Sequence, residues 1–157
     1  MRAVSGIPLL ALMLAAPFAA WADEFSNAEA ARDFIECSAV YDFTANTARQ
    51  AEKPALAVYL HAMGRGAKAA AAYWLAHEHM REHPDAKPRT YGSWDTQIDP
   101  AKEGEMLRLA ALGEAGNWEE IGRDLKFCAD ISGVQAEIIN DFRKGIPASH
   151  AEPVGIP

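Results

Sequence analysis

Cysteine is scarce in this chain, because the 157 residues include only Cys37 and Cys128. Cysteine-based zinc modules need more ligands at close spacing, and covalent haem attachment needs a Cys-x-x-Cys-His motif, so both classes are excluded. A Cys-x-x-Cys redox pair is excluded as well, since the two cysteines lie 91 positions apart.

Basic residues are also in the minority, with 15 Lys and Arg against 22 Asp and Glu and a formal net charge of −7. A surface of this sign repels the phosphates of nucleic acids and the headgroups of anionic membranes. We therefore expect no nucleic-acid partner, and a charged protein partner would be basic.

Two further patterns are missing. No segment keeps the strict alternation of apolar and polar residues that a half-buried strand requires, so a β-sheet is not predicted. The motifs Gly-x-Ser-x-Gly and Ser-x-x-Lys and the phosphate-binding loop are absent. No residue is therefore assigned as catalytic, and the expectation leans away from an enzyme.

The first 22 residues read as a cleaved secretory signal peptide. Arg2 supplies a positive start, residues 3–20 are uncharged and largely apolar, and Ala20-Trp21-Ala22 is a small-x-small cleavage site. A membrane anchor is the alternative, but the uncharged stretch is marginal for a span of about 20 residues. We expect a mature chain from Asp23, without a membrane span, in the periplasm or outside the cell.

The expected export of the chain decides how its two cysteines are interpreted. In an oxidising compartment, an isolated pair such as Cys37 and Cys128 is most simply a disulfide. Closing a loop of this length stabilises a fold by about 4–5 kcal/mol in the chain-entropy model.

Apolar residues recur at spacings of three and four along most of the mature chain, which predicts helices. The expected helices cover residues 27–45, 54–63, 67–83, 99–112 and 117–144. The glycines of Gly64-Arg65-Gly66 could mark a turn, a kink or close helix packing, and Gly133 could bend or break the last helix. The prediction is an all-α, four- or five-helix bundle over residues 23–145, with its first and last helices tied by the disulfide and a loose Pro/Gly-containing tail over 146–157.

Histidines cluster near the end of the third expected helix. His79-x-x-Glu82-His83 has the spacing of an inverted zinc-peptidase motif, but Pro84 follows at once and would leave the site on a fraying turn. A milder hypothesis is a zinc or copper site formed by His77, His79, His83 and Glu82. The alternative is a solvated helix end, where histidine is favoured by the helix dipole. His61 is interpreted as a hydrogen-bonded core or rim histidine.

Two aromatic residues, Tyr91 and Trp94, lie in an expected loop over residues 84–98. Aromatic side chains in loops are common anchors of protein interfaces, so both are candidate partner-binding residues and are expected to be exposed. In the alternative, both rings fold back and cover the core.

The plan of the chain resembles that of small bacterial periplasmic proteins, some of which are immunity proteins that neutralise a toxin. The resemblance covers the signal peptide, the helical body and the Cys37–Cys128 pair, and it transfers no site residues. It implies a non-enzymatic protein-binding, inhibitor or immunity-type module with an envelope protein as partner. The alternative is a metal-binding helical protein.

Overall fold

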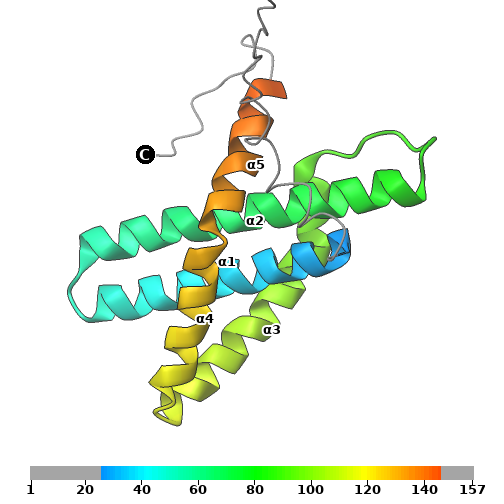
Figure 1. The fold of residues 1–157 in the computed structure, drawn as a ribbon. Coiled ribbons are helices and arrows are strands. Elements are labelled where there is room, and N and C mark those ends of the chain that lie inside the picture. Colours follow the sequence, from blue (N-terminus) through cyan, green and yellow to red (C-terminus); the bar gives the residue numbers. More distant parts are fainter. Residues whose placement is uncertain (1–25, 146–157) are drawn as a thin grey trace, which may run out of the picture.

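The computed structural model describes residues 26–145, which form five α-helices, one short 3₁₀ helix and no strand (Figure 1). The elements are α1 (Asn27–Gln50), α2 (Pro54–Glu82), η1 (Tyr91–Trp94), α3 (Asp95–Glu114), α4 (Trp118–Asp130) and α5 (Ser132–Gly145). The predicted all-α fold is confirmed. The expected signal peptide over 1–22 and tail over 146–157 lie outside the described residues.

Helix α1 begins at a capping box. The Ser26 hydroxyl accepts a hydrogen bond from the Glu29 backbone N–H at 3.2 Å, and the Glu29 carboxylate accepts from the Ser26 N–H at 2.9 Å. These bonds satisfy backbone donors that a helix start leaves free, and the Ser26 N–H lowers the pKa of Glu29. The helix continues past its predicted end at Ala45 as far as Gln50.

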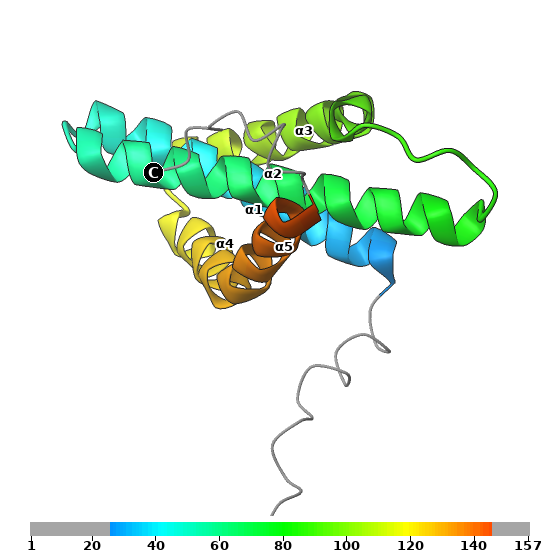
Figure 2. The ribbon, with the colours of Figure 1, turned by 90° about the horizontal axis from the view of Figure 1, so that it is seen from above.

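Helix α1 is the centre of the fold rather than a helix with one apolar face. Its buried residues include the five consecutive positions from Cys37 to Tyr41, which together cover all sides of the helix. Helices α2, α3 and α4 all pack against it. Figure 2 shows α1 and α2 as an antiparallel hairpin with α3 on one side and α4 and α5 on the other.

Helix α2 runs without interruption through Gly64 and Gly66, so the glycines mark neither a turn nor a break between helices. A Cβ on Gly64 would lie 2.9 Å from Asp42 Oδ1 and 3.3 Å from the Ser38 backbone oxygen of α1. A Cβ on Gly66 would lie only 2.3 Å from Gln135 Nε2 of α5. The interpretation of these glycines as positions of close helix packing is confirmed.

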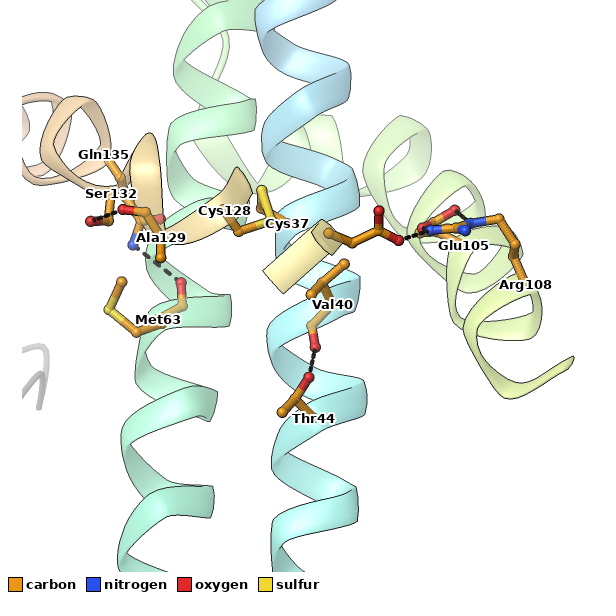
Figure 3. Close-up of a disulfide and its surroundings, with 11 residues drawn as sticks. Cys37, Val40, Thr44, Met63, Glu105, Arg108, Cys128, Ala129, Ser132 and Gln135 are labelled. Carbon is orange, nitrogen blue, oxygen red and sulfur yellow. Dashed lines mark hydrogen bonds and ion pairs between the residues drawn. A yellow bond between two sulfur atoms is a disulfide. The ribbon is translucent and has the colours of Figure 1, made fainter. Parts of the chain in front are cut away.

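The predicted disulfide is present and joins α1 to α4 (Figure 3). Cys37 and Cys128 are both buried, with an S–S distance of 2.07 Å and a Cα–Cα distance of 5.3 Å. The expected last helix is broken at Ile131 into α4 and α5. The Ser132 hydroxyl donates to the Ala129 carbonyl, which satisfies an acceptor that the ended helix leaves free. The bridge therefore holds α4 on α1, while α5 turns to pack on α2.

Helix α3 begins at Asp95, four residues before the expected start at Asp99-Pro100, so Pro100 lies inside the helix. The sequence prediction failed here because η1 leads directly into α3, and the buried Trp94 fixes the junction. Arg108 of α3 pairs with Glu105 of its own helix and joins α3 to α4 by pairing with Glu120 and Asp124. Within residues 26–145, no helix is both long enough and apolar enough to cross a membrane.

Glu78, near the end of α2, links this helix to the start of α1. Asn27 Nδ2 donates to the Glu78 carboxylate at 3.0 Å, and Arg81 donates to the same carboxylate. Arg81 chiefly, with Asn27 adding, holds the pKa of Glu78 below its usual value. Because the folded pKa is depressed, the ionised carboxylate stabilises the fold above the unfolded pKa, and this contribution is lost as the pH falls through the folded pKa.

Glu78→Gln is therefore expected to lower the melting temperature at pH 7 by about 1–3 °C, and the difference from the unmodified chain should be lost at an acidic pH below the folded pKa of Glu78. Thermal melts followed by circular dichroism at the two pH values test this. Glu82→Gln is the control, because the Glu82 carboxylate is exposed and lies 3.8 Å from Arg81. An equal loss in both variants, or a Glu78→Gln loss that persists at low pH, would contradict the expectation.

Candidate functional site

Among the described residues, an apolar groove lies between the first half of α2 and the first half of α5. Its volume is about 430 Å³, and most of its lining is apolar. Residues from α2 form one wall and residues from α5 the other: Ala55, Val58, Tyr59, Ala62 and Met63, and Ser132, Gln135, Ala136 and Ile139. We call this feature the α2–α5 groove.

Two large side chains of the α2 wall remain in contact with solvent. Val58 is 62% exposed and Tyr59 is 60% exposed. Along this part of α2, Leu60 is buried and Met63 is partly buried against the core, whereas Leu56 and Tyr59 are exposed. These two remain exposed because α5 crosses farther along the helix and leaves its first turns uncovered (Figure 1).

Gln135 holds the two walls together. Its side chain is 5% exposed, and its Nε2 donates to the Met63 backbone oxygen at 3.2 Å (Figure 3). Gly66 provides the space for this amide, since a side chain at that position would overlap it. A buried hydrogen bond therefore fixes the angle between α2 and α5, and that angle defines the groove.

Tyr41 of α1 lies close enough to Tyr59 for the two phenols to interact electrostatically. Burial chiefly, and then Tyr59, raises the pKa of Tyr41. The Tyr41 hydroxyl is buried and has no hydrogen-bond partner among residues 26–145. The groove therefore neighbours a phenol that stays protonated at neutral pH.

The predicted metal ligands lie on the last turns of α2, but they do not converge. The rings of His79 and His83 are neighbours, with centroids 5.0 Å apart, whereas the His77 ring packs on Tyr73 at 4.2 Å. Successive residues of a helix are rotated by about 100°, so His77 faces away from the other two histidines. Between residues 26 and 145, no group of three or more His, Cys, Asp or Glu side chains is arranged to hold a metal ion. The structure thus does not bring the predicted set together with Glu82.

His79 is the half-buried member of this segment. Its ring meets the Trp94 ring edge-on, with centroids 5.6 Å apart. Burial chiefly, followed by the positive charge of Arg89 and the neighbouring His83, lowers the pKa of His79. The imidazole is thus favoured in its neutral form at neutral pH.

The two candidate partner-binding aromatics have different environments. Trp94 is 3% exposed and belongs to the core, so its expected exposure is wrong and the alternative, a ring that folds back over the core, is correct for this residue. The segment around it forms the short helix η1 instead of an open loop, and Arg89 lies over the indole at 5.3 Å. Tyr91 is 41% exposed and packs on Phe142 of α5 at 3.8 Å between ring centroids. Tyr91 alone keeps a face that a partner could contact.

His61 has hydrogen-bond partners on both ring nitrogens. Nδ1 lies 2.7 Å from Asp42 Oδ1, and Nε2 lies 2.8 Å from a guanidinium nitrogen of Arg49. Since arginine only donates, Nε2 accepts, and Nδ1 therefore carries the proton that is donated to Asp42. Lys102 of α3 pairs with the other Asp42 oxygen. The interpretation of His61 as a satisfied rim histidine is confirmed.

Sequence reasoning missed the α2–α5 groove and the Asp42 network. Both depend on which turns of neighbouring helices meet, and helical periodicity carries no signal for that. Comparison with protein-family models, curated proteins and solved structures finds no match to the chain.

Proposed function

We propose that this chain is an exported, non-catalytic binding protein that holds a partner protein at the α2–α5 groove. The observation that carries the proposal is the exposure of Val58 and Tyr59 beside an apolar hollow. Exposed apolar side chains that gather around a depression are typical of protein interfaces, whereas single ones need no explanation. An inhibitor or immunity-type role, in which a small rigid module covers a site on another protein, fits this surface.

The shape of the groove favours a helix of the partner over a small molecule. The lining from Ala55 to Met63 extends about 12 Å along α2, which matches about two turns of a helix. An amphipathic helix laid between two others buries its apolar face in such a groove. Tyr59 would be the central anchor, because tyrosine is enriched among the residues that dominate binding energies.

The charge of the chain indicates the kind of protein that would bind. The formal net charge of −7 attracts a basic partner and speeds encounter with it. An amphipathic helix with basic residues on its polar face combines this attraction with an apolar face for the groove.

A location outside the cytoplasm is supported by the buried Cys37–Cys128 bridge, since disulfides persist in oxidising compartments. The sequence pattern of a signal peptide over residues 1–22 agrees with it. We propose the periplasm as the compartment and an envelope or imported protein as the partner.

Site-specific photocrosslinking in the natural host tests the proposal. A photoreactive amino acid at Val58 should give one crosslinked product with a second protein. The same amino acid at Leu107 is the control, because Leu107 is 69% exposed but lies on α3, on the other side of the hairpin (Figure 2). No product from Val58, equal products from both positions, or a product made of two copies of this chain would contradict the proposal.

A further inference from the structure

We infer a second site, independent of the groove: His79 and His83 at the end of α2 form a two-histidine site for Cu(II). The sequence pattern suggested a larger set, and the geometry reduces it to this pair. The site lies on the last turns of α2, whereas the groove lies on its first turns.

The spacing of the two rings suits simultaneous coordination. A nitrogen of each ring bound at about 2.0 Å places each ring centroid about 3.1 Å from the metal. The observed centroid separation of 5.0 Å then corresponds to an angle at the metal of about 105°, close to that of neighbouring ligands in common copper and zinc geometries. The separation of the two rings is therefore compatible with both imidazoles binding one ion.

The surroundings of the pair fix the ring of His79 and leave His83 exposed to solvent. His79 is fixed by its edge-on contact with the buried Trp94. His83 is exposed, so the remaining coordination positions are open to water. A protein that supplies only two imidazoles favours Cu(II), which binds most tightly in the first-row series, over Zn(II), which usually takes three or four protein ligands.

Charged side chains near His79 and His83 influence the affinity of the pair for Cu(II). The guanidinium of Arg89 lies over Trp94 at 5.3 Å and opposes a nearby cation. Glu82, between the two histidines in sequence, provides partial compensation, because its negative charge acts on His79 in the opposite direction to Arg89. We therefore expect a dissociation constant in the micromolar range.

Titration of the metal-free protein with Cu(II) chloride in a non-coordinating buffer, followed by calorimetry, tests the site. The expected result is one ion per chain, with His79→Gln and His83→Gln each weakening binding at least tenfold. His77→Gln is the matched control and should change the affinity less than twofold, because His77 packs on Tyr73 and faces away. Tyr59→Ala should leave Cu(II) binding unchanged, which separates this site from the groove.

Electron paramagnetic resonance of the copper complex provides a second readout, with hyperfine coupling expected from two imidazole nitrogens. Melting temperatures without metal show whether each variant is folded. The inference is overturned if a folded His79→Gln or His83→Gln variant binds Cu(II) as the unmodified chain does. It is also overturned if His77→Gln weakens binding equally, since the ion would then bind diffusely along the segment.

Discussion

Replacing Cys37 and Cys128 together by alanine is expected to lower the free energy of unfolding by about 4–5 kcal/mol. The bridge closes a loop with a sequence separation of 91, so its loss releases the unfolded chain from a long constraint. Both cysteines are buried between α1 and α4, so their removal also leaves a small cavity at the centre of the fold. We expect α4 and α5 to loosen first, because the bridge is the covalent link between α4 and the central helix.

Thermal unfolding in oxidising buffer measures this loss, and the midpoint should fall by roughly 10–20 °C. The unmodified protein in reducing buffer is the control and should lose a similar amount, since it lacks the same bond. A double variant with the same melting temperature as the oxidised unmodified protein would contradict a stabilising role for the bridge.

Gly64→Ala is expected to destabilise the fold by about 1–3 kcal/mol, although alanine is the better helix former. The new methyl group would lie 2.9 Å from Asp42 Oδ1 and 3.3 Å from the Ser38 backbone oxygen. Asp42 cannot move freely, because it holds both His61 and Lys102, and the Ser38 oxygen belongs to the backbone of α1. The helices α1 and α2 would have to separate along their main contact.

Gly122→Ala is the matched control for this substitution. Gly122 lies inside α4, and a Cβ there would meet no atom within 4 Å. Its replacement should stabilise the fold by about 0.5–1 kcal/mol, as helix propensity alone predicts. Denaturant unfolding measures the free energy of unfolding of both variants. A change of the same sign in Gly64→Ala and Gly122→Ala would show that close packing at Gly64 is unimportant.

Local signals in the sequence were sufficient for the helices and for the bridge. The capping box at Ser26 and Glu29 defines its helix start from a pattern four residues long, and two cysteines allow only one intramolecular pairing. These features could be predicted because each depends on neighbouring residues or on simple counting.

Features that depend on how helices meet could not be predicted. The sequence left open whether Trp94 is exposed or folds back over the core, and the early start of α3 carries it into the core. Periodicity did not distinguish Tyr59 from the neighbouring Leu60, which is buried, whereas α5 crosses α2 beyond Tyr59 and leaves it exposed. The candidate binding site is therefore at the first turns of α2 and not in the loop that the sequence indicated. Periodicity identifies the apolar face of a helix, and only packing decides which of its turns are covered.

The contribution of Tyr59 to partner affinity tests the central claim most directly. Once the partner has been identified by crosslinking at Val58, its dissociation constant should be measured for the unmodified protein, for Tyr59→Ala and for Leu107→Ala. We expect Tyr59→Ala to weaken binding at least tenfold and Leu107→Ala to change it less than twofold, with both variants melting as folded proteins. Unchanged affinity in a folded Tyr59→Ala variant, or an equal loss in both, would contradict the assignment of the α2–α5 groove as the binding surface.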